Sequence, residues 1–171
     1  MHKKHPAYKY AMAVAEGKVN APKYVNLQVK EFLTIANGKD SRYMIDDNKV
    51  HTIGELLKLM VMPKGLKANS TVYDAMAGFQ WLFIIAILCT VDRDNKDKRR
   101  YENAILEICR KNGKTFLIAV LFILLFFIEP KFSKFYSVAP DGSLSREIKT
   151  AIEEIIRSSP RSEERRVGKE C

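Results

Sequence analysis

Apolar residues recur at helical spacing through the first part of the chain and predict three helices there. The stretch AYKYAMAVAEG (7–17) carries small and apolar residues on a helical period and ends in glycine, which is favoured just after a helix. The stretch KYVNLQVKEFLTIANG (23–38) follows a proline and ends in Asn-Gly, which suits a helix start and a helix stop. A third helix is predicted over HTIGELLKLMVM (51–62), before a proline. Residues 1–70 are therefore expected to form a helical N-terminal segment.

Beyond this segment the pattern changes to apolar runs separated by charged or turn-forming residues. NAILEIC (103–109) is short and partly apolar, which predicts a buried strand, and FYSVAP (135–140) predicts another. The continuously apolar run 116–128 between them predicts a helix buried on several faces. Strand, helix and strand in this order are typical of a βαβ unit with parallel strands, so the sequence predicts an α/β fold. The other segments are the apolar stretch 71–91, the charge run 92–100, predicted to be a solvated loop, and an amphipathic helix over 144–157.

Two apolar runs, 81–89 and 116–128, raise the alternative of a small membrane-associated protein. A membrane-spanning helix needs about 20 apolar residues. The longer run holds thirteen residues, which cover only about 20 Å as a helix. We therefore expect no membrane partner.

Composition narrows the class of partner more than the class of fold. The chain has 171 residues, 47% of them hydrophobic, which is enough for a core in a single domain or a domain with a small appendage. Lys and Arg number 29 against 20 Asp and Glu, and the net charge of +9 favours an acidic partner such as nucleic acid. The three cysteines, Cys89, Cys109 and Cys171, have no metal-ligand spacing and indicate reduced thiols.

The residues NGKT (112–115) match the end of the phosphate-loop pattern G-x-x-x-x-G-K-[ST], with Ile108 in place of the first glycine. A phosphate loop needs a strand that delivers a tight turn and a helix that begins at the phosphates. The predicted strand, the turn and the apolar helix supply this order. Gly113 would then let the backbone approach the phosphates, Lys114 would contact the β- and γ-phosphates, and Thr115 would hold Mg²⁺ through its hydroxyl. A helix start with a solvated lysine is the simpler alternative.

Three stretches in order, FQW (79–81), ICRKNGKT (108–115) and YSVAP (136–140), together resemble the large terminase subunits of tailed bacteriophages, which are DNA-packaging motors. The similarity covers residues 7–160, because YAMAVAEGKVNAPKYVNLQVKEFL also resembles the helical lead-in of these proteins. The resemblance implies an incomplete P-loop NTPase with a parallel sheet, preceded by the helical segment 1–70. Residues 71–160 would be part of the ATPase domain.

The resemblance also implies roles for individual residues and partners. Gln80 would hydrogen-bond adenine, and Arg110 would lie near the γ-phosphate as a catalytic arginine beside the catalytic Lys114. The nucleotide-binding loop would consist of Arg110, Lys111, Asn112, Gly113, Lys114 and Thr115, with ATP and Mg²⁺ as cofactors. Double-stranded DNA, a portal protein, a small terminase subunit and a homo-oligomeric ring are the implied partners, in the host cytoplasm.

The acidic residues that a phosphate-loop motor needs for Mg²⁺ and for the attacking water do not follow the predicted strands. After Pro140 no apolar run ends in Asp-Glu, and Glu153-Glu154 falls on the polar face of a predicted helix. Residues 161–171, RSEERRVGKEC, resemble one reading frame of a common sequencing adapter. We therefore expect a catalytically incomplete piece of an ATP-driven DNA translocase and endonuclease, with an unpaired strand edge that favours aggregation. A helicase-type P-loop ATPase is the alternative of the same class.

Overall fold

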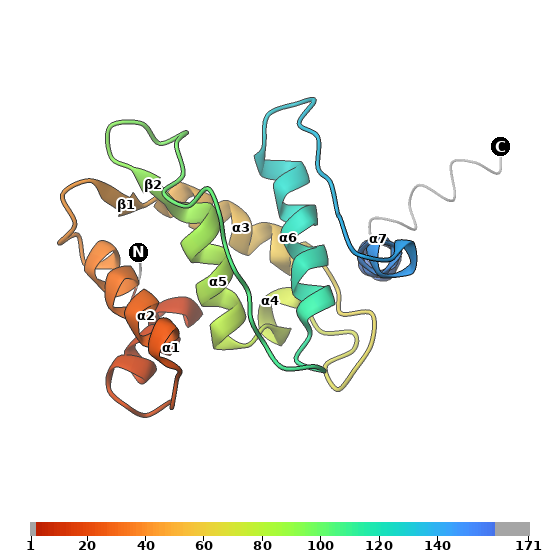
Figure 1. The fold of residues 1–171 in the computed structure, drawn as a ribbon, viewed down its shortest axis with the longest axis horizontal. Coiled ribbons are helices and arrows are strands. Elements are labelled where there is room, and N and C mark those ends of the chain that lie inside the picture. Colours follow the sequence, from red (N-terminus) through yellow and green to blue (C-terminus); the bar gives the residue numbers. More distant parts are fainter. Residues whose placement is uncertain (1–2, 160–171) are drawn as a thin grey trace. The chain divides into compact units, whose positions relative to one another are not determined.

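The computed structural model describes residues 3–159, and the adapter-like residues 161–171 lie outside this range. The described chain is a mixed structure of seven helices and one small antiparallel sheet (Figure 1). It divides into two compact units, which are described separately below. Unit 1 consists of Met1–Thr52 and Met76–Ile105, and unit 2 consists of Ile53–Ala75 and the chain from Leu106 onward. None of the helices in the described range is long and apolar enough to cross a membrane.

Three helices form the core of unit 1, namely α1 (Pro6–Ala15), α2 (Lys23–Ala36) and α5 (Gly78–Cys89). The first two confirm the helices predicted from the spacing of apolar residues, and α1 packs against both α2 and α5. Glycines in the left-handed conformation follow α1 and α2, as their positions in the sequence predict. The fully buried side chains of these helices include Ala7, Ala11, Val29, Phe32, Trp81, Ile84 and Ile85.

The N-terminus of α1 is capped by His5, whose Nδ1 accepts a hydrogen bond of 3.2 Å from the Ala7 N–H. The His5 ring also stands edge-to-face to Trp81 of α5, with 5.0 Å between ring centroids. Burial lowers the pKa of His5 from 6.5 to about 4. The folded protein therefore holds this ring neutral at a pH where the unfolded chain takes up a proton.

This difference in proton uptake predicts a loss of stability in mild acid. As the pH falls from about 6.5 towards 4, protonation favours the unfolded chain, so the free energy of unfolding should fall. We expect a loss of about 1 kcal/mol, because the ring is only half-buried and solvent screens part of the effect. Urea unfolding at pH 7.0 and 5.0 measures it. His5→Asn keeps a capping acceptor that does not titrate, and an equal loss in that variant would contradict the assignment.

The sheet of unit 1 pairs β1 (Tyr43–Ile45) with β2 (Thr90–Asp92) in antiparallel register, with Met44 opposite Val91. The strand β2 follows α5 directly, and the charge run then folds back on it. The Asp92 N–H donates to the Lys98 carbonyl at 3.0 Å, and the Arg100 N–H donates to the Thr90 carbonyl at 2.9 Å. The charge run is thus a loop, as predicted, but its C-terminal end is half-buried and bound to the sheet.

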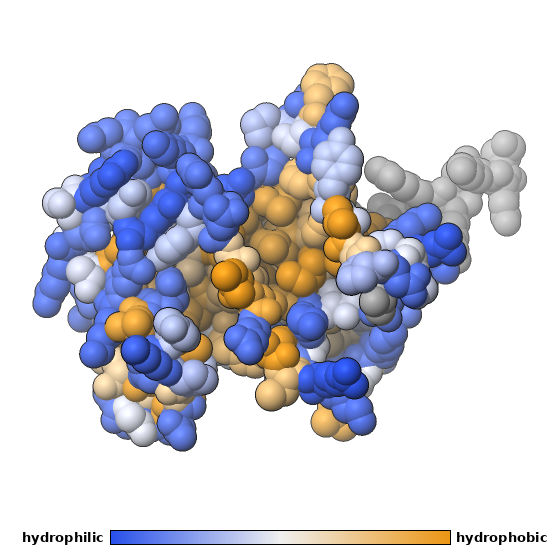
Figure 2. Space-filling view, in the orientation of Figure 1, coloured by the Kyte–Doolittle hydropathy of each residue, from blue (hydrophilic) through white to orange (hydrophobic). Residues whose placement is uncertain are grey.

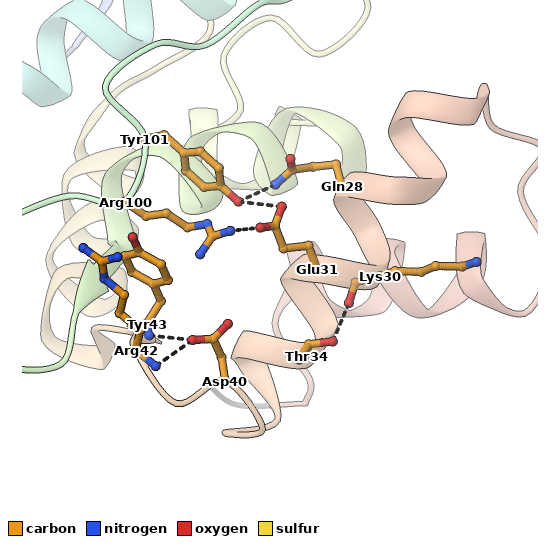
Figure 3. Close-up of polar contacts among 9 residues, drawn as sticks. All are labelled: Gln28, Lys30, Glu31, Thr34, Asp40, Arg42, Tyr43, Arg100 and Tyr101. Carbon is orange, nitrogen blue, oxygen red and sulfur yellow. Dashed lines mark hydrogen bonds and ion pairs between the residues drawn. The ribbon is translucent and has the colours of Figure 1, made fainter.

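Arg100 lies at the centre of a polar network between the sheet and α2 (Figure 3). Its guanidinium forms an ion pair with Glu31 and lies 4.2 Å from the centroid of the Tyr43 ring and 5.3 Å from that of Tyr101. The Tyr101 hydroxyl accepts from Gln28 Nε2 at 3.0 Å and donates to the Glu31 carboxylate at 3.3 Å. Within the described chain, Arg100 Nε is buried and has no hydrogen-bond partner. The network joins three segments that are distant in sequence.

Two further helices, α3 (Asp47–Leu59) and α4 (Val72–Ala75), precede α5. The third predicted helix is confirmed, but it begins and ends earlier than predicted. It begins at Asp47 because the Asp46 carboxylate accepts hydrogen bonds from the N–H groups of Asn48 and Lys49, which caps the helix.

Unit 2 contains α6 (Lys114–Ile128) and α7 (Gly142–Ser158), which pack against each other. Both confirm predicted helices. The Asp141 carboxylate caps α7 by accepting from the Ser143 N–H at 2.9 Å. Glu154 of α7 pairs with Lys64 at 2.8 Å, so the acidic pair of this helix is engaged in surface contacts, as its predicted polar face suggests.

The two predicted strands of the βαβ unit are wrong. Residues 103–109 and 135–140 are extended but pair with no strand, and the described residues form no parallel sheet. Ile105, in the strand predicted to be buried, is 94% exposed, and Val138, in the second predicted strand, is 92% exposed. A strand forms only where another segment offers matching backbone groups, and no described segment does so here.

Candidate functional site

The candidate loop consists of residues 110–115, the last two of which begin α6. Lys111 and Gly113 both have left-handed backbones, with φ of 68° and 74°, and Asn112 between them has a negative φ. In an anion-binding nest, residues that alternate in this way direct successive backbone N–H groups towards one side. The turn is closed by Asn112 Nδ2, which donates to the Cys109 carbonyl at 3.3 Å.

The N-terminus of α6 has no side-chain cap. Gly113 occupies the capping position, and the first backbone bond of the helix runs from the Leu117 N–H to the Gly113 carbonyl at 2.9 Å. In the part of the chain that the structure describes, the N–H groups of Lys114, Thr115 and Phe116 therefore have no partner. The positive end of a fifteen-residue helix faces this turn, which favours an anion.

Basic side chains surround the turn. Arg110, Lys111 and Lys114 are exposed, and Thr115 is half-buried in the first turn of α6. A left-handed backbone at a residue other than glycine costs about 1 kcal/mol, so Lys111 holds a strained conformation that the turn requires. The sequence motif did not indicate this residue's backbone, because lysine rarely adopts it.

The segment that precedes the loop is not the strand that the sequence predicts. Ile108 stands where the first glycine of the full motif would be, and the segment before the loop is extended without a strand partner. The loop therefore has the local turn and helix start of a phosphate loop, but no sheet delivers it. The local geometry needs only residues 109–117.

Gln80, predicted to bind adenine, belongs to unit 1, whereas the loop belongs to unit 2. Its side chain is buried, and its Oε1 accepts a hydrogen bond of 2.9 Å from the Ala77 N–H. Gln80 is thus the N3 residue that satisfies the backbone just before α5. The other six predicted site residues, Arg110 to Thr115, follow one another in unit 2.

The acidic and thiol groups offer no further ligands at the loop. Across residues 3–159, no group of three or more His, Cys, Asp or Glu side chains could hold a metal ion. Cys89 is buried, which raises the pKa of its thiol, and Cys109 beside the loop is exposed.

No family model, no curated protein and no solved structure is significantly similar to this chain.

Proposed function

We propose that the loop 110–115 binds the triphosphate of ATP with Mg²⁺. The observation that carries the proposal is the pair of left-handed residues, Lys111 and Gly113, directly before the uncapped N-terminus of α6. The N–H groups of Lys114, Thr115 and Phe116 have no partner in the described chain and would donate to the phosphate oxygens. The three cations of Arg110, Lys111 and Lys114 complement the charge of a triphosphate.

Each side chain of the loop has a separate role in this proposal. Lys114 donates to the β- and γ-phosphate oxygens, and the Thr115 hydroxyl holds Mg²⁺. Arg110 stabilises negative charge on the γ-phosphate. Hydrolysis also needs a carboxylate that orients the attacking water, and no acidic residue of the described chain is assigned to this role. We therefore expect binding without turnover.

We further propose that the chain is the N-terminal part of a bacteriophage terminase large subunit. The support is the ordered resemblance of FQW, ICRKNGKT and YSVAP, and the net charge of +9 suits a partner such as double-stranded DNA. The full motor would act with a portal protein and a small subunit as a ring in the host cytoplasm, and would also carry an endonuclease.

Calorimetric titration with Mg-ATP tests the proposal directly. Lys114→Ala should weaken binding at least tenfold, because a charged hydrogen bond to phosphate contributes about 1.5–3 kcal/mol. Lys131→Ala is the matched control, since Lys131 is exposed and follows the opposite end of α6. Wild-type protein that takes up no Mg-ATP, or equal binding by the two variants, would refute the site. Steady-state hydrolysis by the wild type should stay at the background rate.

Alkylation of Cys109 gives an independent measure of where the nucleotide lies. In a Cys171→Ser background, Cys109 is the exposed thiol of the described chain, and Cys89 is buried with a raised pKa. Mg-ATP should slow the reaction of Cys109, and it should not do so in the Lys114→Ala variant. Unchanged reactivity at saturating nucleotide would place binding elsewhere.

A further inference from the structure

Residues 134–140 connect α6 to α7 as an open stretch of chain outside any helix or strand (Figure 1), and their backbone is unpaired. Within the described chain, no hydrogen bond joins its N–H or C=O groups to another residue. Phe135 and Ala139 are half-buried, whereas the three residues between them are exposed, Tyr136 to 76% and Val138 to 92%. A segment with free backbone hydrogen-bonding groups and exposed side chains is a surface to which another strand can be added.

The side chain of Phe135 packs this segment against α6 of the same unit. The Phe135 ring stands edge-to-face to Phe126 and Phe122 of α6, with centroid distances of 5.0 and 6.3 Å. Further apolar surface surrounds it, since Phe127 is 68% and Phe132 is 96% exposed. Figure 2 shows this apolar surface over the part of unit 2 that contains α6 and the segment after it. The segment is therefore held against α6 through the side chain of Phe135.

We propose that this segment pairs with the same segment of a second copy of the chain, in antiparallel orientation about a twofold axis at Ser137. Charge supports both the orientation and the partner. The segment begins with Lys134, after Lys131, and is followed by Asp141. Antiparallel pairing brings the basic end of one copy to the acidic end of the other, whereas parallel pairing would align like charges.

The register follows from the geometry of a twofold axis. Directly opposed residues point to the same face of a sheet, so the axis must pass through a residue and not between two residues. With Ser137 on the axis, Tyr136 of each copy lies opposite Val138 of the other, which is a favourable aromatic and β-branched pair. Opposed residues of an antiparallel ladder alternate between hydrogen-bonded and non-hydrogen-bonded pairs. The pair that contains Pro140 is of the same kind as the Tyr136–Val138 pair, and this kind can be the one without hydrogen bonds. The missing N–H of the proline therefore costs nothing in this register.

Sedimentation of the full chain under reducing conditions tests the pairing. Between about 5 and 200 μM, where weak strand-mediated dimers form, the average mass should rise from 19.6 kDa towards twice that value. A monomer throughout this range would overturn the proposal, and so would growth beyond a dimer. The test does not involve nucleotide, so its outcome is independent of the phosphate loop.

A charge exchange at the axis tests the register. Ser137→Lys and Ser137→Glu each place like charges opposite each other, and each variant alone should associate at least tenfold more weakly. An equal mixture of the two variants should recover association to within about threefold of the wild type. Ser137→Thr keeps the backbone and adds no charge, so it should associate like the wild type. Unimpaired single variants, or a mixture that stays monomeric, would overturn the pairing at Ser137.

Discussion

Replacing Gly78 with alanine is expected to lower the free energy of unfolding by about 3 kcal/mol. A Cβ atom at this first residue of α5 would lie 2.7 Å from the Cβ of Tyr10 and 2.9 Å from its Cδ2. The Tyr10 Cβ is bonded directly to the backbone of α1, so a side-chain rotation cannot relieve the contact. Helices α1 and α5 would have to move apart, and this would disrupt the central packing of unit 1.

The same substitution at Gly54 is the matched control. A Cβ atom there would meet Tyr73 Cε2 at 3.6 Å, which is an ordinary contact. Gly54 lies inside α3, so Gly54→Ala removes a flexible residue from a helix and should raise stability by about 0.5–1 kcal/mol. Urea unfolding followed by far-ultraviolet circular dichroism measures both variants. Similar effects of the two substitutions would mean that α1 and α5 are not packed as described.

The helices could be predicted from sequence because their signals are local. The apolar period of residues 23–36, the left-handed glycines at 17 and 38 and the polar face of α7 all act within a few turns of chain. The predicted start of α3 was too late in the chain, and the reason is also local. Its cap, Asp46, stands before a polar first turn, so the apolar period shows only later in the helix.

The strands could not be predicted in the same way, because strand pairing depends on distant segments. NAILEIC and FYSVAP carry β-prone residues, yet both lack a described partner and remain extended. Tyr43–Ile45 and Thr90–Asp92 pair instead, although β2 is only the end of an apolar run that forms α5. Propensity marked segments able to form strands, but the available partners decided which of them did.

The candidate loop divides in the same way into local and distant parts. The turn and the start of α6 lie within a few residues of each other, and the motif predicted them together. The strand behind the loop depends on a sheet, and the role of Gln80 depends on a nucleotide reaching another unit. What the structure shows of Gln80 is again local, since its side chain caps the backbone three residues earlier.

The conformation of the loop therefore does not need the sheet to form. Its left-handed residues and the start of α6 lie next to each other in the chain, and α6 packs on α7. In the proposed function, anion binding is separable from hydrolysis, since binding requires the turn, whereas turnover requires carboxylates positioned by further elements. This separation is the physical basis for expecting Mg-ATP uptake with background hydrolysis.

Replacing Arg100 with methionine is expected to lower the free energy of unfolding by about 2 kcal/mol. Methionine keeps most of the apolar stem but removes the cation that lies 4.2 Å from the Tyr43 ring centroid and pairs with Glu31. The stacked cation contributes about 1–2 kcal/mol and the charged hydrogen bond about 1.5–3 kcal/mol. The loss is smaller than their sum because Arg100 Nε is buried without a partner in the described chain, and methionine removes that cost. Lys98→Met, at an exposed position of the same loop, should stay within about 0.5 kcal/mol of the wild type.

A double-mutant cycle separates the two contributions of Arg100. Glu31→Gln keeps the size of the side chain and removes its charge, so this variant tests the ion pair while the stacking on Tyr43 remains (Figure 3). If the pair joins the loop to α2, Arg100→Met and Glu31→Gln should be non-additive by about 1 kcal/mol. The side chains of Arg100 and Glu31 are 21% and 36% exposed, so added salt should weaken this coupling only in part. Additive effects would assign the whole loss to the tyrosine ring, and the loop would then be held to α2 by the Tyr101 hydroxyl, which bonds Gln28 and Glu31.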